Sequence, residues 1–266
     1  MLRTALTAAA LFVAATPALA HFQLAYTPEV NLSTPGDVPM KFFFWHPMEN
    51  GHAMDMGMPE SLTVTFKGDV TDLTDTLAPI TFHAAHNEAQ GYEAAIPVKR
   101  NGDYIVAFTP APYYEESEDI YIQQITKTIL NKGGIPTGWN EPTGLPTEIV
   151  PLNKPTNVIA GSTFSGVLLS DGEPVAGAEI EIEYMAAAPD METNSPTAPT
   201  VGPMPGGAVV AITDANGAFT FGIPRAGFWG FAALGSGPVT EHEGKELSQD
   251  AVLWIRAYDM ESAATQ

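Results

Sequence analysis

Short segments in which apolar and polar residues alternate recur along the N-terminal half of the chain. Each is rich in Val, Ile, Phe, Tyr or Thr and is bounded by Gly, Pro, Asn or Asp, which is the pattern of β-strands. The segments are 39–46, 61–68, 80–84, 92–98 and 103–110. Between the last two, Asn101-Gly102 predicts a tight hairpin turn. Successive short strands of this kind predict an immunoglobulin-like β-sandwich from residue 21 to about residue 110.

The pattern changes after residue 110. Segment 113–134 fits either one helix or a β-hairpin, and Gly133-Gly134 ends it. Residues 135–158 are rich in proline, which predicts irregular chain between two domains. Segment 186–207 has low complexity and is predicted to be a mobile loop.

Strand patterns return after Gly161 and continue to the segment 250–260. Turn signals at Asp171-Gly172 and at 214–217 separate them. This part of the chain resembles the prealbumin-like sandwiches of carboxypeptidase regulatory domains. We therefore predict an all-β protein with two β-sandwich domains. The predicted divisions are a signal peptide at 1–20, domains at 21–158 and 159–260, and a tail at 261–266.

Composition and the N-terminal residues indicate an exported protein. Arg3, an apolar run and Ala18-Leu19-Ala20 predict a signal peptide that is cleaved before His21. The chain has no cysteine, so it forms no disulfide, and the predicted location is the periplasm. No later apolar run approaches the roughly 18 residues of a membrane span. The net charge of −20, with 11 Lys and Arg residues, argues against nucleic-acid binding and is compatible with cation capture.

The segment 46–60, "HPMENGHAMDMGMPE", is the most unusual in the chain. It contains two histidines and four methionines, namely His46, His52, Met48, Met54, Met56 and Met58. Methionine usually fills a core, but these methionines stand among Ala, Asp, Gly and Pro, which is loop composition. Packing and metal binding therefore both remain open, and in the second case Met54, Met56 or Met58 would supply a soft ligand or an apolar wall.

Cleavage before His21 would give that residue a chemical role. Its α-amine and imidazole, with unperturbed pKa values of about 7.7–8.0 and 6.5, would chelate a metal near neutral pH. With His46 or His52 as a further nitrogen ligand, this predicts a histidine brace. His83 and His86 are expected to be surface or structural residues, and His242 to be solvated.

Residue chemistry leaves the choice of metal open. Imidazole and amine nitrogens suit Ni²⁺, Co²⁺, Zn²⁺ and Cu²⁺, whereas a thioether favours Cu⁺. The Irving–Williams order places copper above nickel at most such sites.

Several segments together resemble the NikK-type periplasmic accessory proteins of nickel and cobalt uptake. They include "AHFQLAYTP", "FFFWHPMENGHAMDMGMPE", "PAPYYEESEDIYIQQITKT" and "TDANGAFTFGIPRAGFWGFAAL", and such segments span nearly the whole chain after residue 20. The resemblance implies a periplasmic protein that binds Ni²⁺, or Co²⁺, and supplies a membrane permease of the energy-coupling-factor type. It points to His21, His46, His52 and the neighbouring methionines as the matching positions.

Two other functions compete with nickel supply. A copper carrier with a histidine brace would explain the methionines, and a structural or adhesive β-sandwich needs no site at all. An oxidative polysaccharide enzyme also uses an N-terminal histidine, but thioethers beside activated oxygen would be oxidised. The chain lacks the G-x-S-x-G and H-E-x-x-H motifs. The sequence therefore predicts a protein that is not an enzyme.

Overall fold

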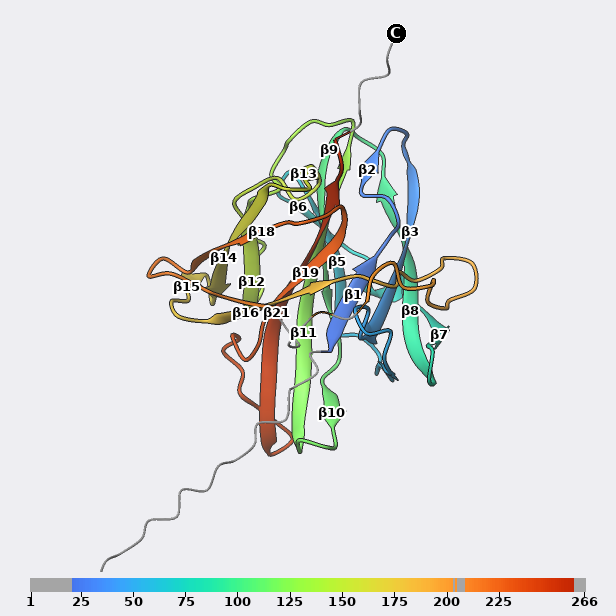
Figure 1. The fold of residues 1–266 in the computed structure, drawn as a ribbon, viewed down its shortest axis with the longest axis vertical. Coiled ribbons are helices and arrows are strands. Elements are labelled where there is room, and N and C mark those ends of the chain that lie inside the picture. The colour runs from blue at the N-terminus through green and yellow to red at the C-terminus, as the bar shows by residue number, and fades with distance from the viewer. Residues whose placement is uncertain (1–20, 203, 205–208, 261–266) are drawn as a thin grey trace, which may run out of the picture.

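The computed structural model describes residues 21–202, 204 and 209–260, and β-strands make up almost all of its regular structure (Figure 1). The one helical element of the described residues is a single 3₁₀ turn, η1 (Thr74–Thr76). The predicted all-β class is therefore confirmed. The predicted signal peptide and tail lie outside the described residues.

Sheet A is formed by the N-terminal half of the chain and has the strand order β1-β3-β8-β7, with β4 paired beside β3. All of these pairings are antiparallel. The strands are β1 (Phe22–Tyr26), β3 (Gly36–Trp45), β4 (Ala53–Met54), β7 (Ala78–His83) and β8 (Glu88–Val98).

Sheet B is the largest sheet and draws strands from both halves of the chain. Its main path runs β17-β16-β19-β21-β11-β9-β5-β6. These strands are β5 (Ser61–Phe66), β6 (Asp69–Asp72), β9 (Gly102–Thr109), β11 (Ile120–Lys132), β16 (Glu179–Tyr184), β17 (Val209–Ile212), β19 (Gly227–Ala233) and β21 (Lys245–Tyr258). Short strands pair at its side, namely β2 (Asn31–Leu32), β10 (Tyr113–Glu115), β13 (Val158–Ile159) and β20 (Glu241–His242).

Sheet C completes the C-terminal half with four strands, β12 (Thr147–Pro151), β14 (Thr163–Ser170), β15 (Glu173–Pro174) and β18 (Ala218–Gly222). The predicted Asp171-Gly172 turn joins β14 to β15, and both of its residues have positive φ angles, 47° and 78°. Such angles are required by the two-residue hairpin turn that suits twisted strands.

The two halves of the chain meet in a parallel ladder between β11 and β21. It runs from the pair Tyr121–Leu247 to the pair Thr128–Trp254. A continuous sheet therefore crosses from the predicted N-terminal domain to the predicted C-terminal domain. The division of the chain into two domains stays a prediction.

Strand β1 and the second half of β3 are buried on both faces of sheet A, which explains the uninterrupted apolar run "FFFW". Phe42 and Phe44 belong to a core cluster that includes residues of β5 and β9. Phe43 and Trp45 point the other way and belong to a cluster that includes Trp254 of β21. A third cluster lies between sheet C and strands β16, β19 and β21 of sheet B. Because β1 and β3 are packed on two sides, the residues at their ends are held by two cores.

The structure corrects two local predictions. Asn101-Gly102 does not close a hairpin, because β8 pairs within sheet A and β9 within sheet B. The turn instead carries the chain between sheets, where the Tyr104 hydroxyl donates to the Arg100 carbonyl (2.8 Å). Residues 135–158 are not wholly irregular, because 147–151 form the buried strand β12 of sheet C.

Two ambiguous segments are also resolved. Segment 113–134 forms the β-hairpin of β10 and β11, not a helix. The described residues of the low-complexity segment pack on the N-terminal half: the Ala187 amide donates to the Pro47 carbonyl (3.0 Å), and the His83 amide to the Asn194 carbonyl (2.7 Å).

Among the described residues, no helix has the length and apolar character that crossing a bilayer requires.

Candidate metal centre

Five of the six histidines lie at one end of sheet A, although they come from separate parts of the sequence. Because neighbouring strands are antiparallel, the starts of β1, β4 and β8 and the ends of β3 and β7 meet at this end (Figure 1). The five residues are His21, His46, His52, His83 and His86. We call this region the histidine end of sheet A.

The register between β1 and β3 brings His21 and His46 together. Phe22 is paired with Trp45 and Gln23 with Phe44, so one further step along the same register places His21 opposite His46. Their ring centroids are 4.2 Å apart with the ring planes inclined at 43°. We call these two residues the inner pair. Residues facing each other across antiparallel strands have neighbouring side chains, so the fold itself creates the contact.

The start of β1 is held on its second edge by side chains. The Gln23 amide donates to Gln124 Oε1 (2.7 Å), and Trp254 Nε1 donates to the Gln23 carbonyl (2.9 Å). Gln124 Nε2 in turn donates to Asp250 Oδ2 (3.2 Å). These buried bonds come from β11 and β21, so the joint between the two halves also positions the strand that His21 precedes.

A tight turn positions His46. The Gly51 amide donates to the His46 carbonyl (3.2 Å), and Trp45 Nε1 donates to the Gly51 carbonyl (3.0 Å). A Cβ atom at residue 51 would lie 3.2 Å from His46 Cβ, so glycine allows this close approach. Within the same turn, two residues after His46, the Met48 amide donates to Glu183 Oε1 (2.7 Å). This bond holds the turn against β16.

The inner pair is shielded from water and faces a carboxylate. Burial lowers the pKa of the His21 imidazole, and this effect outweighs that of the nearby Glu115 charge, which acts to raise the same pKa. Burial acts to raise the pKa of Glu115, but hydrogen bonds from Ser117 and the charges of His21 and His46 bring it below its ordinary value. Imidazole nitrogens close to a carboxylate whose pKa is lowered are an arrangement that favours a bound cation.

His52 lies away from the inner pair in a different contact. Its side chain is exposed, and its ring centroid is 5.5 Å from that of His86, with the planes inclined at 48°. We call His52 and His86 the outer pair. His83 makes a separate contact, because its Nδ1 lies 2.9 Å from Glu88 Oε1.

The three methionines predicted as ligands have different surroundings. Met54 and Met56 are 5% exposed and belong to the core cluster that contains Phe44. Their burial is therefore explained by packing. Met56, with Gln23 and Phe44, also lines a small cavity beside β1. Met58 is 59% exposed. The role of these three methionines as soft ligands stays a prediction.

Within the part of the chain that the structure describes, no group of three or more His, Cys, Asp or Glu side chains is placed to hold a metal ion. The inner pair therefore offers two side-chain nitrogens. Two imidazoles on one metal, at about 2.0–2.1 Å per nitrogen, bring their ring centroids to about 4–6 Å. The separations of the inner and outer pairs both lie in this range. The pairs thus fit late first-row metals, which imidazole suits, with other donors completing the sphere.

The sequence indicated His21, His46 and His52, but not Glu115 or His86 as a partner of His52. Glu115 was visible as part of the acidic run 115–119, yet its place near the imidazoles depends on the pairing of β10 with β11. His86 follows the end of β7, and nothing in its local sequence links it to His52.

The fold and the histidine end describe an all-β protein with paired imidazoles at one sheet end. The chain belongs to the DUF4198 family, a domain of unknown function, whose model matches residues 18–237. No curated protein matches the chain.

Two solved structures that are similar to the chain are both distant in sequence. The D0-D1 domain of Intimin shares 10% identity and a TM-score of 0.20, covering 86% of this chain and 95% of that one. The fibronectin(III)-like modules of Clostridium thermocellum CbhA share 7% identity and a TM-score of 0.21, covering 89% and 95%. TM-scores this low carry no argument about function.

Proposed function

We propose that this protein is a periplasmic carrier that binds Ni²⁺, or Co²⁺, at His21 and His46 and supplies it to a membrane importer. The observation that carries the proposal is the 4.2 Å contact between the two imidazoles, which the β1–β3 register creates. His21 and His46 lie at the edge of a hydrophobic core with the Glu115 carboxylate nearby. Imidazole nitrogens in such a place are suited to bind a late first-row metal ion.

The third nitrogen of the site is the α-amine of His21, exposed when the signal peptide is removed. The described side chains supply no third His, Asp or Glu ligand, and an amine on the same residue as an imidazole closes a chelate ring. The Glu115 carboxylate neutralises part of the charge of the bound ion. The buried Phe44 ring, whose centroid lies 5.4 Å from that of His21, helps to keep this imidazole in place.

Isothermal titration tests the proposal on a chain that begins at His21. We expect tight binding of one Ni²⁺ by the inner pair, and its loss in a chain with one extra alanine before His21, because the extension converts the amine to an amide. His46→Gln should also abolish it, and circular dichroism should show that each variant is folded. Inner-pair binding that survives both changes would refute the proposal.

Copper is the second candidate, because the Irving–Williams order favours Cu²⁺ over Ni²⁺ at nitrogen ligands in a test tube. The metal carried in the cell decides between them. Native mass spectrometry of protein isolated from the periplasm reports the first residue and the bound metal together. We expect His21 as the first residue and nickel as the metal, whereas copper in nickel-replete cells would favour the copper carrier.

A further inference from the structure

The outer pair lies on two loops that are clamped to each other. The Ala53 amide donates to Asn87 Oδ1 (3.0 Å), and Asn87 Nδ2 donates to the Ala53 carbonyl (2.7 Å). His52 directly precedes Ala53, and His86 directly precedes Asn87. This reciprocal clamp therefore fixes the two backbones from which the imidazoles extend, and the ring centroids lie 5.5 Å apart.

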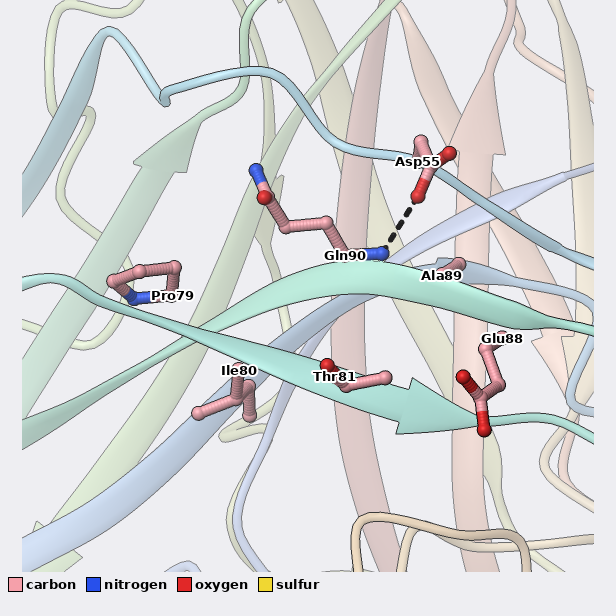
Figure 2. Close-up of a pocket in the computed structure, with 7 residues that line it drawn as sticks. All are labelled: Asp55, Pro79, Ile80, Thr81, Glu88, Ala89 and Gln90. Atoms are coloured by element: carbon pink, nitrogen blue, oxygen red, sulfur yellow. Dashed lines mark hydrogen bonds between the residues drawn. The ribbon is translucent and has the colours of Figure 1, made fainter.

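The segment that follows His52 is also bound to β8. The Gln90 amide donates to Asp55 Oδ1 (2.8 Å), as Figure 2 shows, and the Met56 amide donates to the Gln90 carbonyl (3.1 Å). His52 thus precedes a segment held at several points along its length. A ligand pair on fixed backbones loses less conformational entropy on binding than one on free loops.

Two carboxylates lie on the segments that follow the histidines of the outer pair. Asp55 and Glu88 line a shallow hollow of about 370 Å³ between the segment after β4 and the β7–β8 hairpin (Figure 2). Asp55 lies three residues after His52, and Glu88 two residues after His86. Carboxylates near a surface site raise the local concentration of cations. No lysine or arginine contributes to the lining of the hollow.

From this clamp, the ring separation and the charge, we propose that His52 and His86 form a second, solvent-facing site for a divalent late first-row metal ion. Each histidine gives one imidazole nitrogen, and water fills the remaining positions. The donor set contains neither the chain terminus nor the inner pair. The outer site therefore stands whether or not the inner site binds metal.

The two sites should differ in strength. The outer site has two protein nitrogens, no chelating amine and full access to water, so its ion exchanges readily. We expect its dissociation constant for Ni²⁺ to be at least about tenfold higher than that of the inner site, because each lost nitrogen ligand weakens binding. Such a site would receive ions from solvent at the same sheet end as the inner pair.

Isothermal titration with Ni²⁺ counts the sites. We expect two equivalents for the chain beginning at His21 and one for H52Q/H86Q. A chain extended by one alanine should keep only the weaker, outer equivalent, and the extended H52Q/H86Q chain should bind none. His242→Gln, at β20, is the matched control and should leave both equivalents. The histidines replaced at the outer pair are exposed, so these variants should fold.

The outcomes separate the two proposals. If H52Q/H86Q binds as many equivalents, with the same affinities, as the unaltered chain, the outer site is refuted. If H52Q/H86Q removes one equivalent while the alanine extension changes nothing, the outer site stands and the inner site fails.

Discussion

The inner and outer pairs lie at the same end of one sheet, but the structure builds them differently. His21 and His46 face each other through strand register, with cores on both sides of the sheet and Glu115 near the imidazoles. His52 and His86 extend from exposed loops that the Asn87 side chain clamps. Burial makes the first contact depend on the whole fold, whereas the second depends on a few hydrogen bonds between two surface segments.

The largest expected effect is that of the chain terminus on the inner pair alone. One alanine before His21 removes the amine ligand, and we expect inner-site Ni²⁺ affinity to fall by at least about 100-fold, which is ~2.7 kcal/mol. The outer site should keep its affinity. Titration of both chains measures this, and a similar loss at both sites would remove the distinction between the pairs.

Asp250 should make the stability of the protein depend on pH. It accepts a hydrogen bond from Gln124, which holds the strand that follows His21. Burial raises its pKa from 3.8 to about 7, against hydrogen bonds from Ser248, Gly235 and Gln124. Between these values the folded state keeps a proton that the unfolded state has lost, so the contribution of Asp250 to stability falls as pH rises from about 4 to 7 and is level above that. A shift of about three pKa units sets an upper bound of about 4 kcal/mol on this change. Relaxation and water penetration around the buried carboxyl should reduce the observed change to about 2 kcal/mol.

Urea unfolding of the metal-free protein at several pH values measures this effect. The stability difference between the unaltered chain and Asp250→Asn should decline across that window. The exposed Asp259→Asn serves as the control and should show no such trend. A difference that is constant with pH would show that Asp250 is ionised throughout.

The clamp of the outer pair predicts a local effect of intermediate size. Asn87→Ala removes both hydrogen bonds to Ala53, so we expect outer-site Ni²⁺ binding to weaken about tenfold, or ~1.4 kcal/mol. Inner-site affinity should not change. If Asn87→Ala leaves the outer site intact, the clamp does not prearrange the histidines.

The smallest expected effect concerns the charge beside the inner pair. Glu115→Gln removes a half-buried carboxylate, and we expect inner-site Ni²⁺ binding to weaken by about threefold, as for a partly exposed charge pair. Glu118→Gln, an exposed neighbour, should have no effect. Equal effects of both substitutions would mean that general acidity, not the position of Glu115, attracts the ion.

The sequence predicted strands well because alternation and turn residues are local signals. Segment 39–46 matches β3 closely, and Asp171-Gly172 closes a hairpin as expected. The sequence predicted the structure less well where pairing between distant strands determines the connection. The Asn101-Gly102 turn has a local hairpin signal, but the two flanking strands find partners in different sheets.

The candidate site was predictable only in part for the same reason. His21 and His46 attracted notice through a cleavage pattern and an unusual loop, yet their contact follows from a register that no local signal encodes. The methionine pattern suggested a loop, whereas Met54 and Met56 are packed against the core beneath sheet A. His86 stands beside His52 because Asn87 binds Ala53, a contact between residues far apart in the chain.

The most direct measurement is a crystal structure of the processed protein, beginning at His21 and loaded with Ni²⁺, with anomalous scattering recorded at the nickel edge. We expect a strong anomalous peak about 2.1 Å from the α-amine of His21 and from one imidazole nitrogen each of His21 and His46. Nickel bound elsewhere, with the inner pair in contact and no peak beside it, would contradict the central claim.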